Sequence, residues 1–256
     1  MNPRLDPDRI AGIIREAAQA EILPRFGHLA AGDIREKKPG QLVTEADVAA
    51  EAVLSRRLTD LLPGSKVVGE EAVDADPDLL HQLEGQGVVW VIDPVDGTAN
   101  FAKGNPRFAV IIALVVNGIT RAGWIHDPIA DRMVIAEVGQ GAWMAGRRLS
   151  VLPHGPLDSL RGSVKRSGLL SSLVAEVGRK GSAAHDYLDL VTDVLHFAHF
   201  KKLMPWDHAA GVLIHAEAGG YGRLLNAQPY QPVFCRAGLL LAPCEQSWRD
   251  LSAVIE

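Results

Sequence analysis

The sequence predicts an α+β protein in which helices and sheets are stacked in layers. Apolar residues with helical spacing occur in two segments before residue 65, and short β-branched runs separated by Gly, Pro and Asn follow from residue 67. Further helical patterns lie toward the C-terminus, so helices at both ends of the chain enclose strands in the middle. We expect a single domain over residues 1–256, built from two closely packed halves that meet near residues 140–155.

The two N-terminal helices have recognisable start and stop signals. Asp6 can cap the first helix, which has proline in its first turn, and the apolar pattern ends near Pro24. The second helix begins at Thr44, where the hydroxyl caps the helix and Asp47 answers it, and it ends at residues 63–64. Between the helices, residues 37–40 predict a turn that leads into a short extended piece at residues 42–43. Asp47 therefore lies in the first turn of the second helix.

Most of the predicted strands occupy the middle of the chain. They are rich in β-branched residues and lie at residues 67–68, 88–92, 109–116, 121–125 and 133–138. Two later segments with helical spacing lie at residues 183–197 and 207–217. A strand at residues 238–242 and a helix from Glu245 complete the pattern.

The composition excludes several classes of protein. With 31 acidic and 26 basic residues the net charge is −5, which argues against a surface that binds nucleic acid or anionic lipid. The longest apolar run, residues 108–116, is far shorter than the ~20 residues of a membrane-spanning helix. Residues 1–10 lack the pattern of a secretion signal, so we expect a cytoplasmic protein. Cys235 and Cys244 are too few for a disulfide scaffold, and we expect free, buried thiols.

Residues 90–101 carry the most informative motif. An apolar strand runs directly into two acids, Asp93 and Asp96, with Pro94 between them. We expect Pro94 to end the strand and fix the backbone, so that both carboxylates project from one tight turn and converge on a hard cation. Gly97 and Thr98 then open a predicted helix, whose free N–H groups favour a phosphate. The alternative is a loop in which the two acids only cap turns.

Three more acids stand in comparable places: Asp47, Glu70 and Asp207. Each follows an apolar segment or opens an apolar helix, where burial is partial and an unpaired charge is costly. Each acid on its own can equally be a cap or a surface residue. Together with Asp93 and Asp96 they make a set of carboxylates of the kind that holds two or three magnesium ions around a substrate phosphate.

With these motifs in order along residues 37–245, the sequence resembles the inositol monophosphatase family of magnesium-dependent, lithium-sensitive phosphomonoesterases. The motifs that carry the resemblance are Leu42-Val-Thr-Glu-Ala-Asp47, Gly69-Glu70-Glu71, Asp93-Pro-Val-Asp-Gly-Thr-Ala-Asn-Phe101, Gly181-Ser-Ala-Ala184, and Trp206-Asp207 with Glu217-Ala-Gly-Gly220. The resemblance implies an α-β-α-β-α layered sandwich of the inositol monophosphatase and sugar phosphatase type. It also implies two or three Mg²⁺ ions as cofactors and a homodimer.

The same resemblance implies roles for individual residues. The implied metal ligands are Glu70, Asp93, the Val95 carbonyl, Asp96 and Asp207, with Asp93 bridging two ions. Asp47 and Thr98 orient or deprotonate the attacking water, and Glu70 counts with them as catalytic. The N–H groups of Gly97 and Thr98 hold the phosphate, while Ala183 lies beside the alcohol portion of the substrate. Asp96 and Asp207 also belong to the implied substrate-binding set.

The function we expect is hydrolysis of a phosphate monoester of a small polyol or related alcohol, by in-line attack of water activated by the metal. One alternative is the same chemistry on another small phosphorylated substrate, such as a 3′-phosphonucleotide, fructose 1,6-bisphosphate or histidinol phosphate. Another is a non-catalytic, regulatory member of the family that binds a partner.

One departure from the family concerns the substrate. Seven residues before Asp207, where inositol phosphatases typically carry a glutamate that accepts hydrogen bonds from ring hydroxyls, this chain has Phe200. Because an apolar ring cannot accept those bonds, we expect inositol phosphate to bind less well here. Lys201 and Lys202 follow, and if either points inward, a second anionic group on the substrate gains a charge-assisted contact. The alternative is that Phe200 packs and both lysines are solvated.

Overall fold

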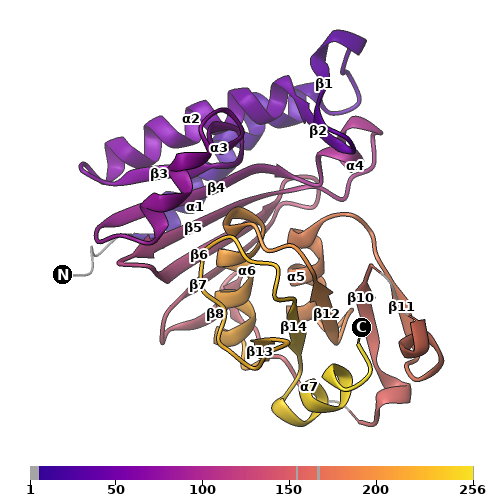
Figure 1. Ribbon diagram of the computed structural model, residues 1–256. Coiled ribbons are helices and arrows are strands. Elements are labelled where there is room, and N and C mark those ends of the chain that lie inside the picture. Colours follow the sequence, from indigo (N-terminus) through magenta and orange to yellow (C-terminus); the bar gives the residue numbers. More distant parts are fainter. Residues whose placement is uncertain (1–5, 154, 166–167, 256) are drawn as a thin grey trace.

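The computed structural model describes residues 6–153, 155–165 and 168–255. Its elements form five layers, helix on sheet on helix on sheet on helix, which confirms the predicted α-β-α-β-α sandwich (Figure 1). From one outer face to the other, the layers are α1 with α2, a seven-stranded sheet, α5 with α6, a five-stranded sheet, and α7. The described part of the chain does not include residues 1–5, which make up half of the segment in which we expect no secretion signal.

The first helical layer follows the caps that the sequence predicts. Helix α1 (Pro7–Ala17) begins after Asp6, whose carboxylate accepts a hydrogen bond from the Asp8 N–H at 3.0 Å. Short helical turns continue the segment to Arg25, as expected from Pro24. Helix α2 (Glu45–Leu61) begins with a capping box formed by Thr44 and Asp47. Before α2, a hairpin of β1 (Ile34–Lys38) and β2 (Gln41–Thr44) confirms the predicted turn.

The larger sheet contains all five strands predicted in the middle of the chain. Its strands run in the order of the sequence, and neighbours are antiparallel except for the first pair, which is parallel. They are β3 (Lys66–Gly69), β4 (Val88–Asp96), β5 (Ala109–Val116), β6 (Ile119–Asp127), β7 (Arg132–Glu137), β8 (Gly141–Met144) and β9 (Arg147–Arg148). Two short helices, α3 (Glu70–Ala75) and α4 (Thr98–Ala102), follow β3 and β4 directly.

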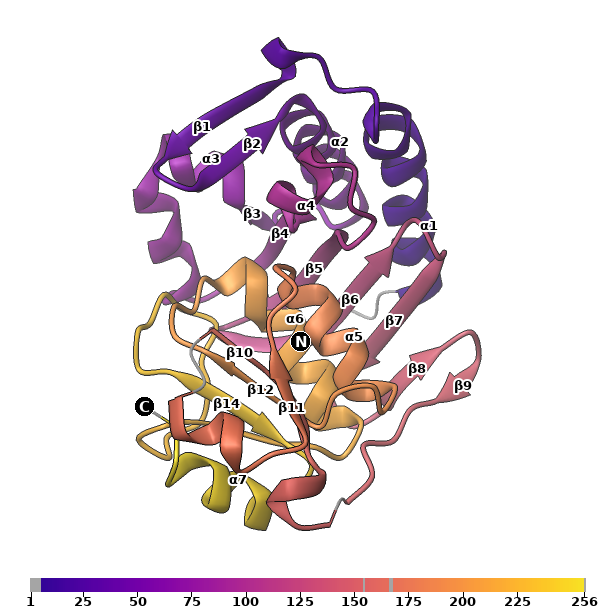
Figure 2. The same ribbon diagram turned by 90° about the vertical axis from the view of Figure 1, so that its right-hand side faces the viewer.

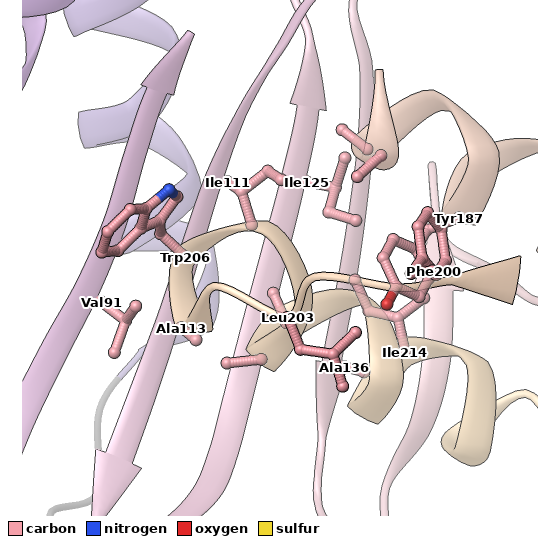
Figure 3. Packing of buried hydrophobic residues seen from close by; sticks show 14 of the residues in the cluster. Val91, Ile111, Ala113, Ile125, Ala136, Tyr187, Phe200, Leu203, Trp206 and Ile214 are labelled. Carbon is pink, nitrogen blue, oxygen red and sulfur yellow. The ribbon is translucent and has the colours of Figure 1, made fainter. Parts of the chain in front are cut away.

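Strand β5 explains why the longest apolar run has no polar alternation. All eight of its residues are buried, because the sheet is covered by helices on both faces. Residues 109, 111, 113 and 115 pack toward α5 and α6, and residues 110, 112, 114 and 116 pack toward α1 and α2. Figure 3 shows Ile111 and Ala113 on the first of these faces, beside Trp206 and Leu203. A strand with two buried faces needs apolar residues at every position.

The smaller sheet lies on the other side of α5 (Ala183–Val191) and α6 (Pro205–Glu217), and α7 (Glu245–Ser252) covers its far face (Figure 2). Its strands are ordered β11-β10-β12-β14-β13. They are β10 (Arg161–Val164), β11 (Glu176–Gly178), β12 (Phe197–Phe200), β13 (Tyr221–Leu224) and β14 (Leu239–Ala242). The predicted final strand and final helix are therefore confirmed.

The predicted helix at residues 183–197 is too long. Helix α5 ends at Val191, and Phe197 already belongs to strand β12. Asp193 adopts a left-handed backbone conformation with φ of 64°, which stops a right-handed helix. The apolar residues after Asp193 fit the 3.6-residue spacing only by coincidence. They lead into strand β12 of the second sheet.

Two expectations drawn from the composition can be compared with the structure. Within the described residues, no helix combines the length and apolar character needed to span a bilayer. Both cysteines are free thiols, as expected, but each is half-buried where full burial was predicted. 

The middle helical layer depends on a close approach at Gly123 of β6. A Cβ atom at this position would lie 2.8 Å from the Ala210 Cα of α6, so Gly123→Ala must push helix and sheet apart. We expect this variant to lose about 1–3 kcal/mol of unfolding free energy, measured by urea denaturation. In Gly12→Ala, the control in α1, the added methyl meets no atom within 4 Å. The control should be unchanged or more stable by up to about 1 kcal/mol, and equal effects of the two changes would contradict the packing argument.

Candidate metal and phosphate site

The two central acids meet because strand β4 contains a bulge. Where β4 pairs with β5, Asp93 lies opposite Ile111 and Asp96 lies opposite Ala109, with an irregularity between the two pairs. Three steps along β4 therefore match two steps along β5, which is the one extra residue of a β-bulge. Residues three apart in a regular strand point to opposite faces, and the extra residue turns Asp96 to the same face as Asp93.

The prediction that Pro94 ends the strand is wrong. Strand β4 continues to Asp96, and Pro94 lies inside the bulge. Proline is tolerated there because a bulge leaves one residue out of the hydrogen-bond ladder. Val95 packs on the opposite face, in the apolar cluster with α1 and α2. The convergence of the two carboxylates, which the sequence predicts, thus comes from the bulge.

Asp96 is held by the start of helix α5. Its Oδ2 accepts hydrogen bonds from Ser182 Oγ at 2.5 Å and from the Ala184 N–H at 2.9 Å. Its Oδ1 accepts from the Ala183 N–H at 3.1 Å. Ser182 is the N-cap of α5, and the N-terminus of a helix stabilises a negative charge. One buried carboxylate therefore joins the first sheet to the middle helical layer.

A chain of polar side chains continues from Ser182 toward the end of β6. Its hydroxyl lies 3.0 Å from Nδ1 of His185, and Nε2 of His185 lies 3.5 Å from a carboxylate oxygen of Asp127. Arg132 donates to the same oxygen of Asp127 at 2.8 Å. Burial acts to raise the pKa of Asp127, but the hydrogen bonds from His185 and Arg132 outweigh it and hold the pKa well below its usual range. The network fixes the hydroxyl that donates to Asp96.

Asp207 completes a cluster of three acids. It lies in the first turn of α6, which begins with Pro205 and packs against both sheets. One carboxylate oxygen from each of Asp93, Asp96 and Asp207 lies within 4.8 Å of the other two. Asp93 and Asp96 are buried, and Asp207 is half-buried, so the cluster opens to solvent on the side of Asp207.

Thr98 and Asp47 form a second group beside the bulge. The Thr98 hydroxyl lies 3.1 Å from Oδ1 of Asp47 and 3.0 Å from the carbonyl oxygen of Val95. A hydroxyl has one hydrogen, so Thr98 donates to one of these oxygens at a time. The other oxygen of Asp47 accepts from the N–H and hydroxyl of Thr44 at 2.8 and 2.5 Å, which fixes the carboxylate. Asp47 is thus both the predicted capping residue and a buried neighbour of Thr98.

Glu70, the first residue of α3, lies next to the cluster of three aspartates but is paired with a lysine. Lys37 Nζ of the β1–β2 hairpin lies 3.0 Å from Glu70 and 2.8 Å from Glu71. The Lys37 side chain is buried, which acts to lower its pKa, but the two glutamates outweigh this and raise the pKa above its ordinary value. Glu70 and Asp207 line the same cavity, so a cation bound by the three aspartates would have Glu70 within its surroundings.

A residue that the sequence prediction missed, Glu51, holds Glu70 in place. Both oxygens of its carboxylate cap helix α3, because they accept from the N–H groups of Glu71 and Ala72 at 2.8 Å each. A Cβ atom on Gly69 would overlap the Glu51 carboxyl group, so the glycine makes room for this cap. Glu51 is an acid within the buried stripe of α2, and that position is the signal by which the sequence could have identified it.

Two other predicted site residues lie at the same junction. Gly97 has φ of 89°, and a Cβ atom there would lie 2.8 Å from the Arg107 carbonyl oxygen, so this turn needs glycine. Gly97 and Thr98 open α4, as expected. Ala183 is the first residue of α5, and its N–H is directed at Asp96. All the residues assigned from the resemblance therefore gather around the bulge of β4, α3 and the starts of α2, α5 and α6.

The electrostatics of the cluster favour a bound cation. Burial, followed by repulsion from Glu70, Asp96 and Asp207, raises the pKa of Asp93 well above its ordinary value. Burial and the neighbouring acids do the same to the pKa of Asp207. Burial raises the pKa of Asp47 to about 6, although its hydrogen bonds act in the opposite direction. Carboxylates this close repel unless a cation lies between them, and oxygen ligands suit hard divalent ions, so the donor set fits such a metal.

These features define an α+β protein with a carboxylate-rich site suited to a divalent metal and an anionic ligand. The model of the inositol monophosphatase family matches residues 8–253. The chain therefore belongs to the inositol monophosphatase family, which is metal-dependent and acts on small phosphorylated substrates, and its enzyme class is phosphoric monoester hydrolase. This confirms the resemblance seen in the sequence.

Curated relatives and solved structures agree with this assignment. The chain is 34% identical over 256 residues to the inositol-1-monophosphatase of Mycobacterium bovis, with 89% of this chain and 87% of the relative covered. A fructose-1,6-bisphosphatase/inositol-1-monophosphatase of Thermotoga maritima is 32% identical, with coverage of 78% and 80%. A Nus factor SuhB of Salmonella typhimurium is 34% identical, with coverage of 72% of each chain. The solved structure of an IMPase from Thermotoga maritima superimposes with a TM-score of 0.81 at 25% identity, covering 96% of this chain and 95% of that one.

Binding of a divalent cation should release protons near neutral pH. Burial raises the pKa of Asp47 to about 6 and that of Glu71 to about 7, and it also raises the pKa values of Asp93 and Asp207 well above their ordinary range, so the site holds protons that a metal must displace. At about pH 6.5 we expect roughly one proton or more released per protein, falling toward zero by about pH 9, and an affinity that rises with pH. Calorimetric titration with Mn²⁺ in two buffers of different ionisation enthalpy measures this number. A proton count near zero at pH 6.5 would show that the acids are ionised without the metal.

Glu51→Gln should impair the site without unfolding the protein. The amide keeps the size of the side chain but accepts from only one of the two N–H groups of α3, so Glu70 loses its fixed orientation. We expect Mn²⁺ affinity to fall about tenfold, and phosphatase kcat/KM to fall by a similar factor, while the protein remains folded at 25 °C. Asp60→Asn, an exposed acid of the same helix, is the matched control and should change neither quantity. An affinity that is unchanged in Glu51→Gln would contradict the positioning role.

Proposed function

We propose that this protein hydrolyses the phosphate monoester of a small polyol or related alcohol with Mg²⁺ as cofactor. The observation that carries the proposal is the contact between Thr98 and Asp47 immediately beside the cluster of three aspartates. This contact supports the proposal, because a group that can orient water lies next to carboxylates that suit a divalent metal. We propose two or three ions, because the acids of the site exceed what one ion needs.

Each residue of the site has a definite task in this proposal. Glu70, Asp93, the Val95 carbonyl, Asp96 and Asp207 would hold Mg²⁺, which would supply Lewis-acid chemistry by lowering the pKa of water and neutralising charge on the phosphate. Asp47 and Thr98 orient the attacking water, and the buried carboxylate of Asp47 accepts its proton. The N–H groups of Gly97 and Thr98 hold the phosphate. Ala183 borders the alcohol portion of the substrate.

Two alternatives differ from this proposal in substrate or in kind. The Thermotoga maritima relative is named for fructose-1,6-bisphosphatase activity as well as inositol-1-monophosphatase activity, and one solved relative is a complex with 2′-AMP. The Salmonella typhimurium relative is named as a Nus factor, which suggests partner binding by a protein of this family. We favour the catalytic proposal for this chain for two reasons. The carboxylate oxygens of Asp93, Asp96 and Asp207 lie within 4.8 Å of one another, and Thr98 is hydrogen-bonded to Asp47.

The wider context of the protein is proposed on the same grounds. We propose a cytoplasmic homodimer in which residues 1–256 form one catalytic domain, and light scattering in solution tests the oligomeric state. We propose that the boundary between the two halves of the domain lies near residues 140–155, and the change from the seven-stranded to the five-stranded sheet between β9 and β10 supports this proposal.

Asp93→Asn tests the proposed function directly. Because one oxygen of Asp93 lies within 4.8 Å of oxygens of Asp96 and Asp207, the variant should lose more than about 99% of kcat for glycerol 2-phosphate at saturating Mg²⁺, a loss of at least ~2.7 kcal/mol of transition-state stabilisation. Without metal the same variant should melt at a higher temperature than the wild type, because burial and the neighbouring acids raise the pKa of Asp93, so folding at neutral pH costs free energy either for the buried charge or for its protonation, and the amide avoids both. Asp250→Asn, an exposed acid of α7, should leave both quantities unchanged. Retention of a tenth of kcat in Asp93→Asn would contradict the assigned metal site, and no phosphate release by the wild type would favour a non-catalytic role.

A further inference from the structure

A cavity of about 330 Å³ extends from the acid cluster toward solvent. On the inner side it is lined by Glu70 and Asp207, which places it beside the proposed metal ligands. Its outer wall contains Lys202 and Phe234. A phosphate ester bound at the acids would therefore extend its alcohol portion along this wall.

Lys202 differs from the other two lysines of the cavity. Lys37 is paired with Glu70 and Glu71, and Lys38 is paired with Asp74 at 3.0 Å. For Lys202, by contrast, no acid within the described residues lies within ion-pair distance of the ammonium group. Burial raises the pKa values of Glu70 and Asp207, and the positive charge of Lys202 acts in the opposite direction. The ammonium group is therefore near the site.

The backbone that carries Lys202 is fixed from two sides. Its carbonyl oxygen lies 3.3 Å from Nε2 of the buried His208. The next residue, Leu203, forms an isolated antiparallel bridge with Cys235, through hydrogen bonds of 2.9 and 3.2 Å. The bridge also brings Phe234 to the same wall of the cavity. The ammonium group therefore extends from a backbone held by hydrogen bonds, which reduces the entropy lost when it binds a ligand.

The rest of the wall offers little to a heavily hydroxylated alcohol. Phe200 does not line the cavity, because it is buried beside Tyr187 (Figure 3). The centre of its ring lies 5.6 Å from that of Tyr187 and 4.6 Å from that of His208. The residues beyond the acids and lysines are mostly apolar: Val73, Pro77, Leu80, Met204, Trp206 and Phe234. Hydroxyl groups placed against such a surface lose their hydrogen bonds to water without replacement.

We propose that Lys202 binds a second anionic group on the alcohol portion of the substrate, so that the preferred substrate is a phosphate monoester that also carries a phosphate or a carboxylate. The inference rests on the proposed phosphatase activity, since the reacting phosphate defines where the alcohol portion lies. Phe200 packs and both lysines are exposed, as in the alternative stated from the sequence, but only Lys202 lines the cavity, so the inference assigns the contact with the second anion to Lys202.

Pairs of substrates that differ in one anionic group test this proposal. 2-Phosphoglycerate differs from glycerol 2-phosphate by a carboxylate in place of a hydroxymethyl group, and fructose 1,6-bisphosphate differs from fructose 1-phosphate by the second phosphate. In at least one pair, we expect the compound with the additional anionic group to have the higher kcat/KM, by about tenfold. The pair that shows the effect identifies the anion. In Lys202→Gln this ratio should fall at least fivefold, mainly through KM, whereas Lys201→Gln should retain the ratio.

Two results would overturn the proposal while leaving the phosphatase activity standing. One is a wild-type ratio near one in both pairs. The other is an equal loss on both members of a pair in Lys202→Gln, which would mean that the lysine serves the reacting phosphate. If no compound releases phosphate, the proposed function itself has failed. Calorimetric binding of fructose 1,6-bisphosphate and fructose 1-phosphate in the presence of Mg²⁺ then decides the inference, because Lys202→Gln must weaken only the bisphosphate.

Discussion

The buried carboxylate of Asp96 is the contact on which the geometry of the whole site depends. Three hydrogen bonds from the start of α5 offset the removal of this charge from water, and they also dock α5 against the end of β4. Helix α5 packs on both sheets through the largest apolar cluster. The position of Asp96, and with it the acid cluster, is therefore coupled to the packing of the two halves of the protein.

The acid cluster is a local weakness that the rest of the fold compensates. Carboxylates brought together in a buried place repel one another and favour protonation, which opposes folding when no cation is bound. Apolar clusters on both faces of the larger sheet and beneath the smaller sheet supply the stabilisation. Strand β4 shows both roles in one element, because residues 88–92 are apolar core and residues 93–96 carry the acids.

The parts of the site that depend on local sequence could be predicted, and those that depend on pairing between distant segments could not. The cap at Thr44 and the fully buried strand at residues 109–116 follow from short-range patterns. The bulge at Asp93 and Asp96 arises only from the register with β5. The sequence alone therefore predicted that the strand ends at Pro94. Glu51 likewise acts on the start of α3, twenty residues away, and helical periodicity alone shows only that it faces inward.

The residues proposed for the reaction and the residue proposed for substrate choice lie on different kinds of structure in this protein. The acids and Thr98 are placed at strand ends and helix starts, where caps and ladder hydrogen bonds fix them. The part of the cavity wall at Lys202, Met204 and Phe234 comes from connecting segments, which the bridge of Leu203 with Cys235 holds together. Substitutions in such segments alter what touches the alcohol portion without moving the carboxylates. Lys202 precedes α6 and lines the cavity, so its side chain can change without altering the packing of the helix that carries Asp207. On the proposed assignment, the substrate preference of this site can therefore change at residue 202 while its reaction chemistry stays the same.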